Sequence, residues 1–153
     1  MVEKYSEKVK QIINVAYEAY HGKKRDGIPY ICYLINVADD YDDDVMIVWF
    51  LNNIMTNTGI PYRLIDDLDI SKECKEAVQL LEYDGKVSLE EYITSLKSNR
   101  LARIVKSHEL RYMVKYECKD DPEKVEELRR ARDIISNYMR EEGKKSKQWI
   151  IQN

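Results

Sequence analysis

The amino-acid sequence predicts an all-α fold, a single compact bundle of about six to eight helices. Apolar residues recur at helical spacing along most of the chain, and no segment alternates apolar and polar residues as a half-buried strand does. Five Gly and three Pro among 153 residues are too few turn-forming residues for a many-stranded sheet. A chain of this length fits one domain, which we expect over residues 1–143, followed by a tail over 144–153.

The spacing of apolar residues and the positions of Gly and Pro predict the first elements of the chain. Apolar positions over residues 4–20 predict the first helix, which Gly22 can end in the left-handed conformation. The segment Lys23–Pro29 combines three cations with Gly and Pro, so it predicts an ordered basic loop. A short helix is expected after this loop, over residues 30–39.

A run of aspartates precedes the most apolar segment of the chain. Between Asp39 and Asp44 only Tyr41 interrupts the series. We expect these carboxylates to cap a helix over residues 45–55 rather than to bind calcium, because the Gly and the terminal Glu of a calcium loop are missing. That helix is apolar almost all round, which predicts the buried centre of the fold.

Capping residues mark the starts of the later helices. Ser71 precedes an apolar stripe, and Ser88 with Glu91 forms a capping box. Asp121 and Pro122 open a last, long helix. The sequence therefore predicts helices over about 61–68, 71–81, 88–96 and 100–116, and a final helix from 122 that ends near Gly143.

Charge and cysteine content narrow the classes of partner and compartment. The net charge is −3, so no general basic field is available to hold nucleic acid or an anionic membrane, and neither partner is expected. The longest apolar run, Val45–Leu51, is too short to cross a bilayer. Cys32, Cys74 and Cys118 form neither a disulfide framework nor a metal knuckle, which favours a reducing, cytoplasmic setting.

Common catalytic motifs are missing from the sequence. It contains no glycine-rich phosphate loop, no nucleophile elbow and no zinc-protease helix. His21 and His108 are the two histidines of the chain, too few to assemble a histidine-rich metal centre. Each has an ordinary structural explanation, His21 beside the helix end at Gly22 and His108 on an apolar stripe.

Four blocks, taken in order, resemble a known family. They are Ala19–Cys32, Val37–Ala38, Leu51–Gly59 and the segment 92–106. Their order resembles the HD-domain metal-dependent phosphohydrolases, in particular the guanosine tetraphosphate (ppGpp) hydrolase domains and their short stand-alone relatives. The resemblance covers roughly residues 5–140 and implies that the predicted domain over 1–143 is HD-like.

The resemblance also implies that the metal site of the family is degenerate in this chain. The family binds a divalent metal such as manganese through imidazole and carboxylate ligands, which this type of ion prefers. Neutral or altered residues stand at those positions here, so we expect no metal, no cofactor and no catalytic residue. Two histidine positions hold Tyr20 and Cys32, the His-Asp pair corresponds to Asn52 and Asn53, the following acidic pair to Thr56 and Asn57, and the distal aspartate to Glu109.

Ligand binding without a metal is the function that these residues leave open. Lys24 and Arg25 match the family loop that lies against the nucleotide, and Tyr30 could pack alongside. A solvated basic loop is the structural alternative. We therefore expect a non-catalytic nucleotide-sensing or protein-interaction module; the alternative is a phosphohydrolase acting on ppGpp or another nucleotide through a rebuilt site.

The C-terminal tail offers a third possibility. A basic run, Lys144–Lys147, precedes the apolar residues Trp149, Ile150 and Ile151. An apolar triplet of this kind has to pack somewhere. It could dock onto its own domain, or it could pair with a protein partner or a second protomer, which would make the chain a structural, oligomerising protein.

Overall fold

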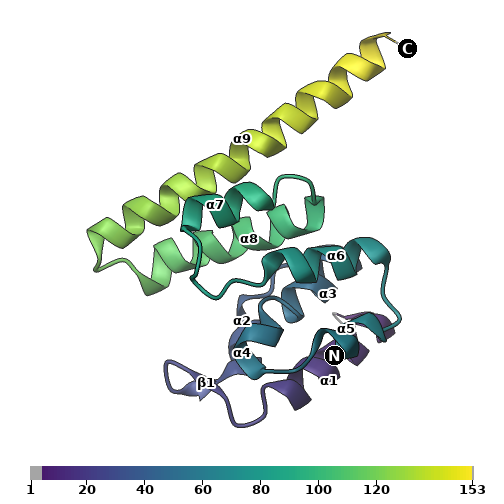
Figure 1. Cartoon of the computed structure of the whole chain (residues 1–153), viewed down its shortest axis with the longest axis vertical. Coiled ribbons are helices and arrows are strands. Elements are labelled where there is room, and N and C mark those ends of the chain that lie inside the picture. The colour runs from purple at the N-terminus through teal and green to yellow at the C-terminus, as the bar shows by residue number, and fades with distance from the viewer. Residues whose placement is uncertain (1–4, 153) are drawn as a thin grey trace. The chain divides into compact units, whose positions relative to one another are not determined.

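The computed structural model describes residues 5–152, with side chains up to Lys144, and is almost entirely helical. The predicted all-α class is confirmed. Within the described residues, the strands are limited to one hairpin of two strands, each two residues long (Figure 1). The contacts group the chain into two compact units, Met1–Asp84 and Gly85–Asn153. Each unit is described below by itself.

The first unit is built around a buried helix. Its elements are α1 (Glu7–Ala19), β1 (Lys24–Arg25), β2 (Ile28–Pro29), α2 (Tyr30–Val37), α3 (Asp43–Phe50), α4 (Ile54–Thr58), α5 (Tyr62–Asp66) and α6 (Lys72–Leu81). Every residue of α3 from Val45 to Phe50 is buried, and both α1 and α6 pack against it. The apolar sequence of this segment predicted such a central element, because a helix with no polar face needs neighbours on all sides.

Side-chain caps start the helices of this unit where the sequence predicts them. The Asp42 carboxylate accepts a hydrogen bond from the Val45 N–H at 3.1 Å, and the Ser71 hydroxyl accepts one from the Cys74 N–H at 3.1 Å. Such bonds satisfy N–H groups that have no partner inside the helix. The capping role predicted for the aspartate run is therefore confirmed at Asp42.

The structure adds a detail to one prediction for this unit and contradicts another. The basic loop contains a hairpin, in which Lys24 pairs with Pro29 and Arg25 with Ile28. Asp26 and Gly27 both have positive φ, 51° and 84°, as a two-residue hairpin turn with right-handed strand twist requires. The helix expected over 45–55 is interrupted: α3 ends at Phe50, and α4 begins at Ile54 after a turn.

The second unit is a small helical bundle. It contains α7 (Leu89–Ser95), α8 (Arg100–Tyr112), a π-helical turn, η1 (Met113–Glu117), and α9 (Pro122–Gln152). Ser88 and Asp121 cap α7 and α9 through the N–H groups of Glu91 and Lys124, as predicted. Helix α9 packs against both α7 and α8. The core of this unit includes Ile93, Leu96, Leu101, Leu128 and Ile135.

The predicted end of the last helix near Gly143 is wrong. Helix α9 continues through Gly143 to Gln152, a length of 31 residues. A glycine costs a helix interior about 1 kcal/mol relative to alanine, and this cost alone does not end a helix unless the backbone turns left-handed. Within the described residues, no helix is long and apolar enough to cross a membrane.

Candidate functional site

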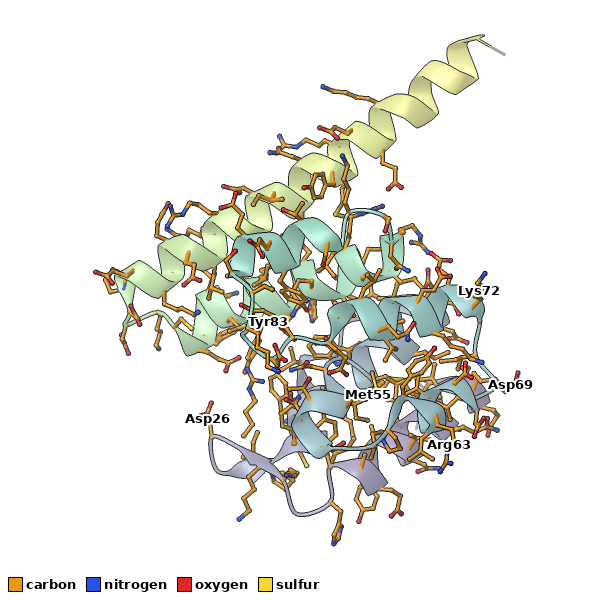
Figure 2. All side chains as sticks on the ribbon, in the orientation of Figure 1. Asp26, Met55, Arg63, Asp69, Lys72 and Tyr83 are labelled. Atoms are coloured by element: carbon orange, nitrogen blue, oxygen red, sulfur yellow. The ribbon has the colours of Figure 1, made fainter. Side chains whose placement is uncertain are left out.

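The basic hairpin places its two cations on different sides. Successive side chains of a strand point to opposite faces, and in β1 Lys24 is exposed whereas Arg25 is half-buried. The Arg25 guanidinium lies over the Tyr33 ring, 4.2 Å from its centroid, and Nη1 is 3.4 Å from the Tyr30 hydroxyl. Arg25 is therefore held against α2, while Lys24 points away from these aromatic side chains. Figure 2 shows Asp26 at the tip of the hairpin.

Two tyrosines and two asparagines form a hydrogen-bonded group beside Arg25, here called the tyrosine–asparagine cluster (Tyr20, Tyr30, Asn53 and Asn57). The Tyr20 and Tyr30 rings are stacked, with centroids 4.2 Å apart and planes inclined by 9°. The Asn57 amide donates to the Tyr20 hydroxyl at 3.1 Å and to the Tyr30 hydroxyl at 3.3 Å. Its carbonyl oxygen accepts a hydrogen bond from the Asn53 amide at 3.3 Å. The cluster thus joins α1, α2 and α4 through neutral groups.

The turn between α3 and α4 supplies Asn53 in an uncommon backbone conformation. Its φ is 58°, in the left-handed region, which asparagine tolerates better than most residues. The Asn53 side-chain oxygen accepts a hydrogen bond from the Tyr83 N–H at 2.9 Å. Because the turn changes the chain direction after Phe50, the side chain of Asn57 on α4 can meet the two tyrosines.

Glu82 fixes the start of α4 from the other side of the turn. Its carboxylate accepts hydrogen bonds from the N–H groups of Met55 and Thr56, both at 2.9 Å, and from the Thr56 hydroxyl at 2.6 Å. These bonds satisfy the free N–H groups of a helix that has no cap from its own N-cap residue. Figure 2 labels Met55, near the start of α4, and Tyr83, the residue that follows Glu82.

Tyr20 cannot act as a base in this environment. The side chain is 3% exposed. Burial raises the pKa of Tyr20 well above its ordinary value, and the nearby Tyr30 raises it further, outweighing the stabilising hydrogen bond from Asn57. The hydroxyl stays protonated at physiological pH, and the cluster keeps a hydrogen-bonding but uncharged character.

The remaining positions that the family resemblance assigns to metal ligands lie in both units. Cys32 is exposed on α2, and Asn52 is buried in the turn before Asn53. Glu109 belongs to α8 in the second unit, where its carboxylate lies 2.6 Å from the ammonium of Lys106. Over the residues that the structure describes, no group of three or more His, Cys, Asp or Glu side chains is arranged to hold a metal ion.

The ion pair of Lys106 and Glu109 is largely shielded from solvent. The two side chains are 8% and 19% exposed, and the Lys106 ammonium also lies 5.1 Å from the centroid of the Tyr92 ring. Burial alone would lower the pKa of Lys106, but the attraction of Glu109 and Tyr92 raises it above its ordinary value. The Glu109 carboxylate is therefore already neutralised by a neighbour on its own helix.

Sequence reasoning missed two participants in the first unit, Tyr33 and Glu82. Tyr33 follows Tyr30 by three residues, and this spacing places both rings on one helix face, so the signal was available. Glu82 accepts hydrogen bonds from Met55 and Thr56, which lie 27 and 26 residues earlier in the chain, and no local sequence pattern reveals contacts at such separations.

Comparison with known proteins adds no assignment: no protein-family model matches the chain, and no curated protein is significantly similar to it.

Proposed function

We propose that this protein is a non-catalytic homologue of the HD-domain phosphohydrolases that binds a phosphorylated nucleotide without a metal ion. The observation that carries the proposal is the tyrosine–asparagine cluster next to Arg25. Neutral, mutually hydrogen-bonded side chains stand at Tyr20, Asn53 and Asn57, positions that the family resemblance assigns to metal-site residues. Arg25 of the hairpin lies beside the cluster, in contact with Tyr30 and Tyr33, whereas Lys24 is exposed on the other face of the strand.

The chemistry of the cluster supports binding rather than hydrolysis. A bound metal ion makes water a nucleophile by lowering its pKa, and for this it needs ionised or imidazole ligands. Amide and hydroxyl oxygens are weaker ligands, and in this cluster they already bond one another. Hydrogen-bonding groups of this kind can still orient a nucleotide.

Arg25 is the residue that we assign to the anionic part of the ligand. Its guanidinium lies over the Tyr33 ring, which restricts its rotamers before any ligand arrives. A guanidinium held in this way presents its N–H groups to a phosphate in a fixed plane. Tyr30, in contact with Arg25, is placed to pack beside the nucleotide.

The first experiment is a calorimetric titration with GDP, GTP and ppGpp in the presence of EDTA. We expect binding that the chelator leaves unchanged and that Arg25→Ala weakens by about 10-fold or more, since a charge-assisted contact contributes about 1.5–3 kcal/mol. Lys24→Ala is the matched control, because it removes a cation on the opposite side of the same strand and should weaken binding far less. Equal losses in the two variants would contradict the assigned contact.

The second experiment tests hydrolysis directly. We expect no manganese-dependent release of phosphate or pyrophosphate from these nucleotides. Turnover that EDTA abolishes would instead support the alternative, a phosphohydrolase with a rebuilt metal site. The proposal also includes a reducing, cytoplasmic setting, which the three free cysteines support.

A further inference from the structure

Arg25 is the cation of the basic hairpin that lies against the candidate site. Its guanidinium is 4.2 Å from the centroid of the Tyr33 ring, and Nη1 is 3.4 Å from the Tyr30 hydroxyl. Lys23 and Lys24 are exposed, and within the described residues neither side chain forms a hydrogen bond or an ion pair. The hairpin therefore supplies one positioned positive charge to the tyrosine–asparagine cluster.

The backbone of the hairpin keeps this charge in one place. The Lys23 N–H donates to the Tyr20 carbonyl, and the Tyr30 N–H donates to the Lys23 carbonyl, both at 2.9 Å. The Tyr33 ring holds the guanidinium at the other end of the side chain. A guanidinium fixed in this way can form two parallel hydrogen bonds to one phosphate group, but it cannot follow a longer chain of phosphates.

Glu82 brings a negative charge close to the same cluster. Its carboxylate accepts hydrogen bonds from Met55 and Thr56, and within the described residues it belongs to no ion pair. Burial and Tyr30 raise the pKa of Tyr20, and the charge of Glu82 raises it further, so this charge acts on the cluster. A second or third phosphate would meet repulsion from Glu82.

The surroundings of the site offer little compensation for a polyphosphate. Proteins that hold nucleoside triphosphates commonly use a metal ion to bridge and neutralise the outer phosphates. No group of three or more metal-ligating side chains is found over the part of the chain that the structure describes. In the first unit Asp and Glu also outnumber Lys and Arg, so its overall field opposes a strongly charged anion.

We infer that the ligand of this site carries a single phosphate group, as a nucleoside monophosphate does. The inference rests on the proposed function, because it names the class of nucleotide that the same site binds. One guanidinium matches one phosphate monoester in geometry and offsets part of its charge. Each further phosphate adds a negative charge for which the hairpin holds no second cation against the cluster.

The inference is tested by calorimetric titration of the full chain with guanosine, GMP, GDP and GTP in EDTA. We expect GMP to bind about 10-fold or more tightly than guanosine, through the charge-assisted contact with Arg25. GDP and GTP should bind about 3-fold or more weakly than GMP, because their added charge is repelled.

The outcomes separate this inference from the proposed function. If GTP binds as tightly as GMP or more tightly, and Arg25→Ala weakens both, the single-phosphate inference is overturned while the proposed function stands. If none of the nucleotides binds, or if guanosine binds as tightly as GMP, both are overturned.

A second variant tests the repulsion from Glu82. Glu82→Gln removes the negative charge and retains one acceptor oxygen, so the ratio of the GTP and GMP dissociation constants should fall about 2-fold or more. Both ligands are measured on the same protein, so a partial loss of folding does not change the ratio. Glu18→Gln, at an exposed position of α1, is the matched control and should leave the ratio unchanged. Equal ratios in the wild type and Glu82→Gln would overturn the role assigned to Glu82.

Discussion

The side-chain oxygen of Asn53 accepts a hydrogen bond from the backbone N–H of Tyr83, 30 residues further along the chain, at 2.9 Å. This bond joins the turn after α3 to the segment after α6 and accompanies the left-handed backbone of Asn53. The amide group of Asn53 at the same time donates to Asn57. One side chain therefore links the backbone of the turn to the tyrosine–asparagine cluster.

Two substitutions of Asn53 separate the effect of backbone strain on stability from the effect of the hydrogen bonds. Asn53→Ala should lower the free energy of unfolding by about 2–3 kcal/mol, because it removes both bonds and leaves a Cβ in the left-handed region. Asn53→Gly removes the same bonds without the strain and should cost about 1 kcal/mol less. Urea denaturation of both variants checks this. Equal losses would contradict the role of the left-handed conformation.

Glu82→Ala should destabilise the first unit by about 1–2 kcal/mol, the usual cost of losing a helix cap. The N–H groups of Met55 and Thr56 lose their acceptor, and Met55 is only partly exposed. Glu82→Gln retains one acceptor oxygen and should cost less. Thermal melting compares the two variants with Glu18→Ala, which removes an exposed glutamate of α1. A loss in Glu18→Ala as large as that in Glu82→Ala would argue against a specific cap.

The protein should lose stability above about pH 10, the ordinary pKa of tyrosine, and Tyr20→Phe should reduce that loss. The folded state raises the pKa of Tyr20, so above pH 10 the unfolded chain releases this proton while the folded chain keeps it. The unfolded state is thereby favoured by up to about 1.4 kcal/mol for each further pH unit.

The measurement is urea denaturation of the wild type and Tyr20→Phe between pH 8 and pH 11. Other groups with raised pKa values, such as Lys106 and the buried thiol of Cys74, whose pKa is raised to about 11, contribute in both proteins. The difference between the two pH profiles therefore isolates Tyr20. Parallel profiles would show that Tyr20 ionises in the folded protein as it does in water.

A double-mutant cycle on Lys106 and Glu109 should give a coupling energy of about 1–3 kcal/mol. Glu109→Gln should be the more damaging single change, because it leaves a buried ammonium without its carboxylate. Lys106→Met leaves Glu109, which is 19% exposed and can reach water. The exposed pair Lys72 and Glu76, 3.9 Å apart, is the control, for which we expect less than about 0.5 kcal/mol. Similar coupling in the two pairs would contradict the effect of burial.

Local sequence signals predicted most helix starts, because a cap involves residues only three positions apart. Asp42, Ser71, Ser88 and Asp121 all accept the bonds that their positions suggest. The break between α3 and α4 could not be found in this way. Apolar residues continue through Leu51 and Ile54, and the contact that accompanies the turn comes from Tyr83, far away in sequence.

The candidate site was predictable only in part, because many of its contacts join residues far apart in sequence. Arg25 and Tyr30 are five residues apart, and Arg25 Nη1 lies 3.4 Å from the Tyr30 hydroxyl; that both contact a nucleotide stays a prediction. Lys24 was grouped with Arg25, although strand alternation separates the two side chains; the sequence Asp26-Gly27 signals the hairpin that causes this. The bonds from Asn57 to Tyr20 and Tyr30 span 37 and 27 residues, and they arise only once α1, α2 and α4 are packed.

The confinement of helix contacts to one half of the chain has a consequence for folding kinetics. The principal helix contacts fall within one unit each, α1 with α3 and α3 with α6 in the first, and α7 and α8 with α9 in the second. The entropy lost in closing a loop grows with its length, so short separations keep the folding barrier low. Helical domains with such local contacts reach the native state in microseconds to milliseconds. A newly made chain of this sequence should therefore bury its apolar stripes soon after each unit leaves the ribosome.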